Sequence, residues 1–311
     1  MTSSKRRFQG RNCTLFMGYA LFPCLSDTPP YQTFKKMIPM KFSIIVTTTG
    51  RPREIREFLQ SLEKQTYKDL EVILGDQDKD LSLAGYLKTL SFPSTYIPLE
   101  PCSLSHARNC LLPAVQGDIV ALGDDDCLYQ PDLLEKVACI AQQQPSTAVF
   151  ICMPSNDSPR SGIAKVSRRG LFYAAPSISL FFDAIWLRKI GDFDEGIGIG
   201  APTPWQSGEE TDILLRIHAL GGQILRCLHI ARPWHPEADL SKTDTFRKAH
   251  GYGIGRMYLL HKHGFPFWFK LCNILYPLGL LPVDLIRKGH RSAKLRWAMF
   301  TGRVKGFFMT R

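Results

Sequence analysis

Residues 42–48 read FSIIVTT and residues 119–126 read IVALGDDD, and these two stretches decide the fold. The first is a β-branched apolar run, which is typical of a strand buried on both faces of a sheet. The second places an apolar strand, Ile119–Leu122, directly before a glycine and three aspartates. Together they predict a covered sheet with acidic side chains where one strand ends.

Strand-like and helical segments alternate around these two stretches. The expected strands are Phe42–Thr48, Leu70–Gly75, Thr95–Pro98, Ile119–Leu122 and Thr147–Cys152, and the expected helices are Arg53–Lys64, Leu81–Leu90, Ser103–Leu112 and Pro131–Gln143. This alternation predicts an α/β fold with a mostly parallel central sheet and flanking helices. The first strand lacks a G-x-G-x-x-G after it, and the sequence has no G-x-x-x-x-G-K-[ST], which argues against dinucleotide dehydrogenases and P-loop NTPases.

Composition excludes several other classes of protein. The chain has 311 residues, of which 44 % are hydrophobic and 22 % are charged, so it is not a disordered, collagenous or polytopic membrane protein. Its nine cysteines form no C-x-x-C pair. They indicate reduced thiols in a cytoplasmic protein instead of a zinc module or a disulfide framework.

The net charge of +11 is concentrated at the two ends of the chain. Residues 1–41 carry +6 and residues 264–311 carry +8, which leaves −3 for the part between them. Nucleic-acid binding would favour a basic face on the folded body, so we expect no nucleic-acid partner. Basic ends beside apolar stretches favour an anionic membrane surface.

We expect three parts along the chain: a poorly ordered extension at 1–40, a globular body at 41–263 and a helical, basic segment at 264–311. Residues 265–286 are apolar and nearly long enough to span a bilayer, but prolines and charged residues interrupt them. A segment that lies on the membrane is the preferred interpretation, and a helical subdomain that covers the core is the alternative.

The three aspartates, Asp124, Asp125 and Asp126, predict a metal site. Adjacent carboxylates repel one another, and a divalent cation compensates their charge. Hard oxygen ligands suit Mg²⁺ or Mn²⁺, which usually bridge to substrate phosphates. A solvated acidic turn that caps the next helix is the alternative. His235, which follows a strand-like segment at 223–230, is a candidate to complete the metal shell or to contact a phosphate.

The stretch SGEETD at 207–212 predicts a general base. It opens a helix, and acidic residues stabilise a first helical turn, so capping is a competing role. Asp212 can fill the capping role. Glu209 and Glu210 are then two further carboxylates, and their position beside a glycine-rich loop favours a base that faces a cleft.

The motifs FSIIVTTTGRP, LEVILGDQD, LSHARN, GDIVALGDDD and SGEETDILLR resemble, in order and spacing, the family 2 glycosyltransferases with the GT-A fold. The resemblance covers roughly Lys41 to His263. It implies that GDDD is the D-x-D element and that EETD is the base motif, with Glu210 at a position where the family has Asp. Glu209 is the second candidate for the base.

The resemblance also implies roles for individual residues. Asp126 would be the main metal ligand, and Asp124 would contact the ribose or help to fix the metal. Trp205 would stack on an acceptor sugar or anchor its loop. The nucleotide would contact four further side chains, those of Thr47, Thr48, Asp76 and Arg108, and a helix-surface position is the alternative for Arg108.

These roles imply a metal-assisted, inverting transfer from a nucleotide sugar, with UDP as the expected nucleotide, to a glycan or lipid-linked acceptor in cell-surface polysaccharide synthesis. The expected location is the cytoplasmic face of the cell membrane. Two alternatives stay open, a sugar nucleotidyltransferase and a catalytically inactive scaffold that binds membranes.

Overall fold

The computed structural model describes residues 39–310 except residue 79 and the segments 153–161, 174–175 and 237–242. Most of the expected N-terminal extension therefore lies outside the described residues. Within them the strands form one eight-stranded sheet in the order β3-β2-β1-β4-β7-β5-β8-β6. The strands are β1 (Phe42–Thr48), β2 (Leu70–Asp76), β3 (Ser94–Pro98), β4 (Ile119–Asp124), β5 (Thr147–Cys152), β6 (Ile163–Lys165), β7 (Leu180–Asp183) and β8 (Gln223–Cys227).

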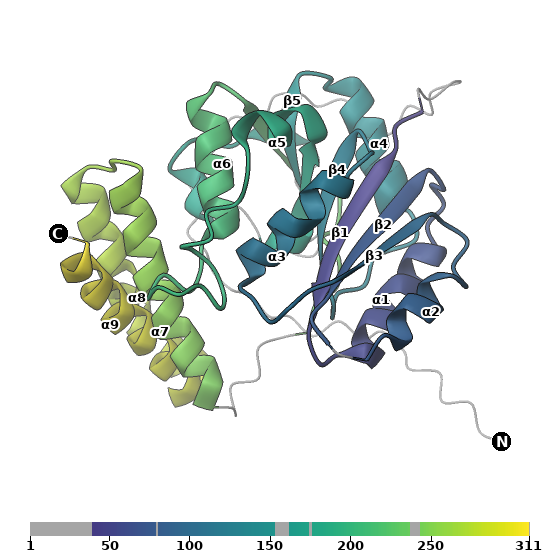
Figure 1. Ribbon diagram of the computed structural model, residues 1–311. Coiled ribbons are helices and arrows are strands. Elements are labelled where there is room, and N and C mark those ends of the chain that lie inside the picture. Colours follow the sequence, from purple (N-terminus) through teal and green to yellow (C-terminus); the bar gives the residue numbers. More distant parts are fainter. Residues whose placement is uncertain (1–38, 79, 153–161, 174–175, 237–242, 311) are drawn as a thin grey trace.

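Helices cover both faces of this sheet (Figure 1). They are α1 (Pro52–Glu63), α2 (Ser82–Leu87), α3 (Leu104–Leu111), α4 (Leu133–Gln143), α5 (Ala184–Ile190), α6 (Glu209–Ala219), α7 (Thr243–Lys262), α8 (Phe267–Lys288) and α9 (His290–Met309). Within the described part of the chain, the connections contain the short 3₁₀ helices η1 (Leu112–Ala114), η3 (Gly170–Tyr173) and η4 (Ser177–Ser179).

The alternation of side chains along β1 shows how the two layers of core arise. Ile44 packs with α1, α2 and α4 on one face, and its neighbour Ile45 packs with α3, α5 and α6 on the other. Both side chains are buried. A strand that is apolar on both faces is what a covered parallel sheet requires.

The expected mostly parallel α/β sheet is confirmed. Strands β3, β2, β1 and β4 are parallel neighbours, and β5 pairs in parallel with β8. Two short strands that the sequence pattern did not indicate run antiparallel: β7 lies between β4 and β5, and β6 pairs with β8 at the edge.

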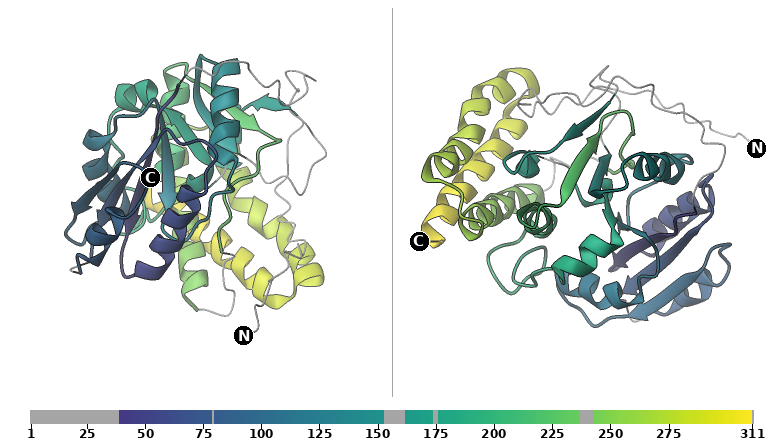
Figure 2. Two further views of the ribbon diagram at one scale, coloured as in Figure 1. Left: turned by 90° about the vertical axis from the view of Figure 1, so that its right-hand side faces the viewer. Right: turned by 90° about the horizontal axis from the view of Figure 1, so that it is seen from above.

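The three last helices form a helical region at the end of the sheet opposite α1 and α2 (Figures 1 and 2). The expected helical C-terminal segment is therefore present as α8 and α9. The helix α7, which precedes the expected boundary at 263, packs against α9 and belongs to the same helical region. Glycines allow α7 and α9 to approach closely, since a Cβ on Gly253 would lie 2.7 Å from the carbonyl oxygen of Met299.

Candidate active site

Parallel pairing brings the predicted nucleotide and metal residues to one edge of the sheet. Thr47 lies beside Asp124 in the register of β1 and β4, and Thr48 lies beside Asp76 in the register of β1 and β2. The carboxyl ends of the strands thus gather these side chains, as the sequence predicted.

Asp76 is fully buried at the end of β2. Its Oδ2 accepts a hydrogen bond of 3.0 Å from the Tyr96 hydroxyl, and its Oδ1 accepts one of 3.0 Å from the backbone N–H of Asp78. Burial raises the pKa of Asp76, although these two hydrogen bonds act in the opposite direction.

The three aspartates after β4 have different partners. Asp124 accepts a hydrogen bond of 3.1 Å from the Ser177 hydroxyl. Asp125 accepts one of 2.9 Å from Thr48 Oγ1 and contacts Arg51 at 2.9 Å. Arg51 also contacts Asp126 at 2.8 Å. Its positive charge and the two hydroxyl groups offset part of the mutual repulsion of the carboxylates.

His235 lies beside Asp126 because the chain forms a β-bridge just before it. Leu128 and Trp234 exchange two backbone hydrogen bonds, which brings the residues after β4 and β8 together. The Nε2 atom of His235 is 3.2 Å from Oδ1 of Asp126. This contact lowers the pKa of Asp126 and raises that of His235, whereas burial raises the pKa of Asp124 and Asp125.

Asp126 and His235 fit a divalent cation. Two cis ligands of an octahedral ion with bonds of about 2.1 Å lie about 3 Å apart, close to the separation of these two atoms. Among the described residues, no group of three His, Cys, Asp or Glu side chains encloses a complete metal site. Mg²⁺-type ions usually take their remaining ligands from waters and substrate phosphates, so an incomplete protein shell suits them.

Glu209 and Glu210 begin α6, after Gly208 in a left-handed conformation with φ +104°. Glu209 is buried, with 4 % of its surface exposed, while Glu210 is half-buried. Burial, followed by repulsion from Glu210, raises the pKa of Glu209 to about 8. The glycine loop passes so close that a Cβ on Gly198, whose φ is +112°, would lie 3.2 Å from Oε2 of Glu209.

Arg108 joins the two acidic groups, and the helix-surface alternative for it is wrong. Its side chain is buried, and Nη1 donates a hydrogen bond of 2.9 Å to Oε1 of Glu210. Oε1 of Glu209 lies 3.7 Å from Nη1, and Oδ1 of Asp124 lies 3.8 Å from Nη2. The structure places this guanidinium between the D-x-D carboxylates and the candidate base.

Trp205 stacks on Tyr258 of α7, with ring centroids 4.5 Å apart and an angle of 12° between the planes. One face of the indole is therefore covered, which favours the loop-anchor alternative over a free platform for a sugar.

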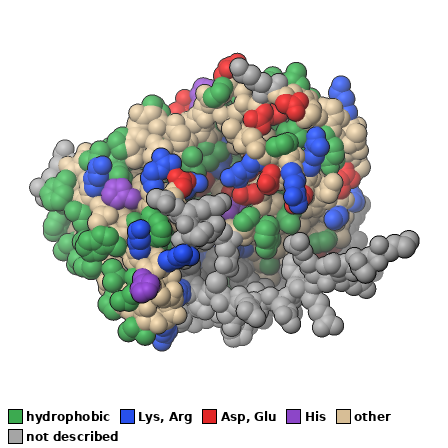
Figure 3. Space-filling model, turned by 90° about the horizontal axis from the view of Figure 1, so that it is seen from below, with side chains coloured by type: hydrophobic (Ala, Val, Ile, Leu, Met, Phe, Trp, Pro, Cys, Tyr) green, Lys and Arg blue, Asp and Glu red, His purple; other side chains and the backbone are tan. Residues whose placement is uncertain are grey.

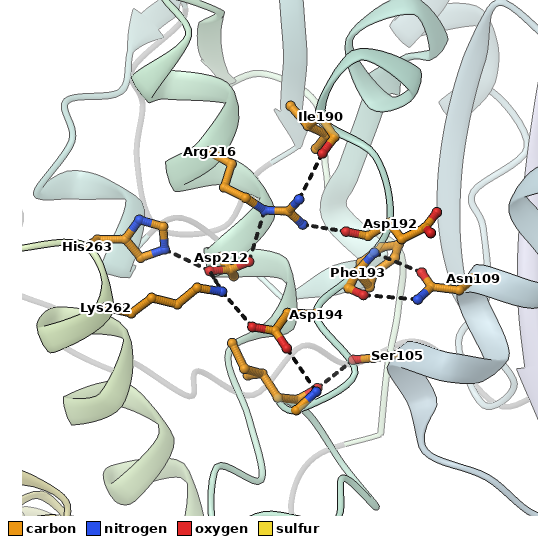
Figure 4. A network of polar contacts seen from close by, with 12 residues as sticks. Ser105, Asn109, Ile190, Asp192, Phe193, Asp194, Asp212, Arg216, Lys262 and His263 are labelled. Carbon is orange, nitrogen blue, oxygen red and sulfur yellow. Dashed lines mark hydrogen bonds and ion pairs between the residues drawn. The ribbon is translucent and has the colours of Figure 1, made fainter. Parts of the chain in front are cut away.

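A network of polar contacts around the buried side chain of Asp212 holds α6 in place (Figure 4). Asp212, one turn after Glu209, is fully buried and lies 2.7 Å from both Lys262 Nζ and His263 Nε2 at the end of α7. Arg216 lies 3.0 Å from Asp212 and donates hydrogen bonds to the carbonyl groups of Ile190 and Asp192. The network ties α6, the helix of the candidate base, to both the glycine loop and the helical region.

Sequence reasoning missed Arg51, Ser177 and this network. Arg51 follows β1 in the Gly-Arg-Pro stretch at 50–52, and its local pattern assigns it no role, although a cation at the end of β1 is the natural partner for carboxylates at the end of β4. Ser177 and Lys262 come from distant segments, and no local pattern indicates that they meet Asp124 and Asp212.

Comparison with known proteins gives the family. The profile described as "Glycosyl transferase family 2" matches residues 43–199, about half of the chain, and the chain therefore belongs to this family. An uncharacterized glycosyltransferase of Haemophilus influenzae is 35 % identical over 106 residues, which are 33 % of this chain and 35 % of that protein. The uncharacterized glycosyltransferase YwdF of Bacillus subtilis is 32 % identical over 114 residues, 36 % of this chain and 41 % of that protein. The matched region thus spans well under half of the length of either relative.

Solved structures share the fold. The mannosyltransferase PcManGT of Pyrobaculum calidifontis, in complex with GDP-Man and Mn²⁺, superposes with a TM-score of 0.59 at 16 % identity, covering 93 % of this chain and 91 % of that one. S. aureus TarS 1-349 in complex with UDP gives a TM-score of 0.51 at 17 % identity, covering 88 % and 92 %. The expected GT-A fold is confirmed.

Proposed function

We propose that the protein is an inverting glycosyltransferase that uses a divalent cation and transfers a sugar from a nucleoside diphosphate sugar, with UDP as the preferred nucleotide, to a glycan or lipid-linked acceptor. The observation that carries the proposal is the meeting of two chemically distinct acidic groups across Arg108. One group is the aspartate triplet, in which Asp124 lies 3.8 Å from Nη2 of Arg108 and Asp126 with His235 suits a cation. The other group, Glu209 with Glu210, suits a proton acceptor.

The donor would occupy the edge formed by β1, β2 and β4. We assign contacts with the nucleotide to Thr47, Thr48, Asp76 and Asp124, because their side chains gather at this edge. The UDP in the TarS structure and the GDP-Man and Mn²⁺ in the PcManGT structure support a nucleotide sugar and a cation on this fold.

Asp126 and His235 would hold Mn²⁺ or Mg²⁺, which when bound neutralises the diphosphate as it leaves. Arg51 and Arg108 carry fixed positive charge near the same position, where they stabilise charge on the departing phosphates.

Glu210 would accept the proton of the acceptor hydroxyl. The hydroxyl oxygen forms a bond to the anomeric carbon, the bond from that carbon to the β-phosphate oxygen breaks, and the nucleoside diphosphate leaves with the electron pair. This single displacement inverts the configuration. A positioned general base typically contributes about 10²–10⁴-fold to the rate. Arg108 orients Glu210 through its hydrogen bond, and the raised pKa of Glu209 favours a neutral neighbour that does not compete for the proton.

The helical region supports the expected membrane surface. Within the described residues, one helix, Phe267–Lys288, is long and apolar enough by composition to cross a membrane, and 28 % of its apolar window is buried. Its outer face exposes Phe267, Trp268, Leu271, Leu275, Leu278 and Ile286, and its inner face buries the polar side chains Asn273 and Asp284. Figure 3 shows hydrophobic side chains gathered with Lys and Arg over this part of the molecule.

A helix that faces water exposes polar side chains, whereas α8 exposes apolar ones, and two of its four buried residues, Asn273 and Asp284, are polar. We therefore propose that α8 lies on the cytoplasmic face of the membrane with basic residues at the headgroups, where a lipid-linked acceptor of polysaccharide synthesis would be found.

A panel of nucleotides in thermal unfolding, with and without Mn²⁺, tests the proposal. We expect UDP to raise the unfolding midpoint more with Mn²⁺ than without it. A preference for nucleoside triphosphates would indicate a nucleotidyltransferase instead, and no response to any nucleotide would indicate a scaffold. Release of UDP from labelled UDP-sugars in the presence of membrane lipid extract then identifies the sugar.

A further inference from the structure

Arg51 contacts two of the three aspartates that follow β4. Its Nη1 atom lies 2.9 Å from Oδ1 of Asp125 and 2.8 Å from Oδ2 of Asp126, so one nitrogen bridges two carboxylates. Neighbouring carboxylates repel one another, and a positive charge between them offsets this repulsion. The guanidinium thus provides the same kind of charge compensation that a divalent cation would provide.

Asp126 has both of its carboxylate oxygens engaged. Oδ2 contacts Arg51, and Oδ1 lies 3.2 Å from Nε2 of His235, the atom with which it fits a divalent cation. A cation held by Asp126 and His235 would share the Asp126 carboxylate with the guanidinium. Two positive charges would then lie on one side chain, within the screening length of ~8 Å at physiological ionic strength, and would repel each other. In this position Arg51 therefore opposes binding of the cation.

The backbone around Arg51 is held in place, whereas its side chain is exposed. The N–H of Gly50 donates hydrogen bonds of 2.9 and 2.7 Å to the two carboxylate oxygens of Asp78, and the carbonyl of Arg51 accepts the first backbone hydrogen bond of α1, of 3.1 Å. The side chain of Arg51 is 48 % exposed, whereas those of Asp125 and Asp126 are 11 % and 21 % exposed. The guanidinium therefore lies on the open side of the carboxylates and can change partners by rotation of its side chain.

Departure of the guanidinium would leave each group with a suitable new or remaining partner. Asp125 keeps the hydrogen bond of 2.9 Å from the hydroxyl of Thr48 at the end of β1. Asp126 loses the contact at Oδ2 and gains the charge of the cation instead. Arg51 itself requires an anion, and the diphosphate of a nucleotide sugar at this edge of the sheet supplies one, because guanidinium forks match phosphate oxygens in geometry and charge.

We propose that Arg51 exchanges partners when the donor binds. It neutralises Asp125 and Asp126 before binding and contacts the diphosphate of the nucleotide sugar afterwards, which leaves Asp126 to the cation. The inference rests on the proposed function and adds an order of events to it: the cation binds weakly to the protein alone and enters the site together with the nucleoside diphosphate. Arg51 is thus a positioning residue that couples the binding of the two ligands.

Binding of Mn²⁺ with and without UDP tests this coupling in the absence of any transfer reaction. Free and bound Mn²⁺ are measured by electron paramagnetic resonance for wild type and Arg51→Gln, and the Mn²⁺ bound by UDP in solution is determined separately and subtracted. Without UDP, the variant should bind Mn²⁺ about tenfold more tightly, the order expected when a positive charge a few ångströms from a divalent ion is removed. With saturating UDP, both proteins should bind Mn²⁺ with similar affinity, because Arg51 has then left Asp126.

A guanidinium that stays on the aspartates predicts a different result. Arg51→Gln would then strengthen Mn²⁺ binding by the same factor with and without UDP, and the gain in Mn²⁺ affinity caused by UDP would equal that of the wild type. Partner exchange instead lowers this gain about tenfold in the variant. Because coupling between two ligands is reciprocal, Mn²⁺ should also strengthen UDP binding about tenfold less in Arg51→Gln. An equal gain in wild type and variant would overturn the proposal.

Two further variants control for charge, and thermal unfolding shows that each variant is folded. Arg51→Lys keeps the charge and should restore the weak binding of Mn²⁺ alone. Arg53→Gln removes an equal charge from an exposed ion pair of α1 and should bind both ligands as the wild type does.

The exchange and the proposed function fail in different ways. A wild type that binds no Mn²⁺ even with UDP contradicts the cation of the proposed function, and the exchange with it. A wild type that binds Mn²⁺ with UDP, combined with an equal gain in Arg51→Gln, contradicts the exchange alone.

Discussion

The Nη1 atom of Arg108 lies 2.9 Å from Oε1 of Glu210, and through this contact one buried guanidinium connects the candidate base to the D-x-D carboxylates. The carboxylates of Asp124, Glu209 and Glu210 would repel one another strongly at this burial without it. Arg108 thus offsets this repulsion and lowers the pKa of Glu209, against the larger effect of burial.

Replacing Arg108 with Gln should lower turnover and move the pH optimum upward. Arg108 lowers the pKa of Glu209, so its loss should raise that pKa further and leave the repulsion between the two glutamates uncompensated. The measurement is the pH dependence of kcat. Arg53→Gln, at an exposed pair on α1, is the matched control. An unchanged pH profile in Arg108→Gln would show that the guanidinium does not tune the base.

Replacing Asp126 with Ala should abolish transfer and the Mn²⁺-dependent part of UDP binding while the fold persists. Asp126 is the aspartate of the triplet whose pKa is lowered, by its contact with His235, so it is available as an ionised ligand. Calorimetric titration of UDP with and without Mn²⁺ measures the effect. Asp132→Ala, which removes an exposed carboxylate paired with Lys136, should leave both titrations unchanged. Metal-dependent UDP binding that survives in Asp126→Ala would place the metal elsewhere.

Replacing Glu210 with Gln should keep donor binding and lower kcat by at least about 10²-fold, the lower end for a lost general base. Glu209→Gln is the natural comparison, because it alters the adjacent carboxylate on the same helical turn. If Glu209→Gln is the inactive variant, the base is one residue earlier, and if neither loses activity, α6 does not carry the base.

The raised pKa of Glu209 predicts a dependence of stability on pH. A carboxyl group with a pKa near 8 in the folded protein and about 4.3 in the unfolded chain favours the unfolded state increasingly as pH rises between these values. The variant Glu209→Gln lacks this destabilisation. Its unfolding midpoint should therefore exceed that of the wild type by more at pH 8 than at pH 5. A difference that is independent of pH would mean that Glu209 is ionised in the folded protein.

Much of the fold and most of the site's acidic residues were predictable from the sequence for physical reasons. The strands β1 and β5 have the bounds that were predicted, and β2 ends one residue later than predicted, because long apolar runs leave little choice of register. Asp124 and Asp126 were identifiable because they directly follow such a strand. Strand β7 was not predicted, because four residues that pair antiparallel between β4 and β5 carry no periodic signal of their own.

The partners of the site residues were less predictable than the residues themselves. Asp212 was interpreted as part of a helix cap, since an acidic residue in a first turn fits that role. Its actual partners, Lys262 and His263, are about fifty residues further along the chain, and only the packing of α7 against α6 brings them together.

Replacing Asp212 with Asn should destabilise the protein by about 3–5 kcal/mol, the usual cost of removing one partner from a buried ion pair. Burial alone would raise the pKa of Asp212, but hydrogen bonds from His263 and Lys262 lower it below its ordinary value. A lowered carboxyl pKa contributes stability above the unfolded value of about 3.9, and this contribution is lost as the pH falls through the folded pKa. Denaturant unfolding should thus show the full difference between wild type and Asp212→Asn at pH 7 and a smaller one at pH 3. A constant difference would exclude the ion pairs as its cause.

The apolar and basic surface of the helical region should bind anionic membranes without inserting across them. Two pairs of substitutions separate its contributions: Arg287→Gln with Arg291→Gln removes exposed charge, and Leu275→Gln with Ile286→Gln removes exposed apolar surface. These are preferable to deletion of α8 and α9, which would uncover the face of α7 that Gly253 packs against α9. The removal of two cations should weaken binding to anionic vesicles about 30-fold, at ~1 kcal/mol for each.

Salt distinguishes a helix on the surface from one that spans the bilayer. The screening length falls from ~8 Å at physiological ionic strength to ~3 Å at 1 M, so headgroup attraction should largely vanish at high salt, and the wild type should leave vesicles of phosphatidylglycerol and phosphatidylcholine. A spanning α8 would instead resist salt and require detergent, because ~20 apolar residues would then lie in hydrocarbon. Lys64→Gln with Lys88→Gln, exposed cations at the opposite end of the sheet, is the control for net charge and should float as the wild type does. If the variant with Leu275→Gln and Ile286→Gln floats as well as the wild type, the apolar face does not contact lipid. The alternative interpretation, in which α8 covers the core, would then hold.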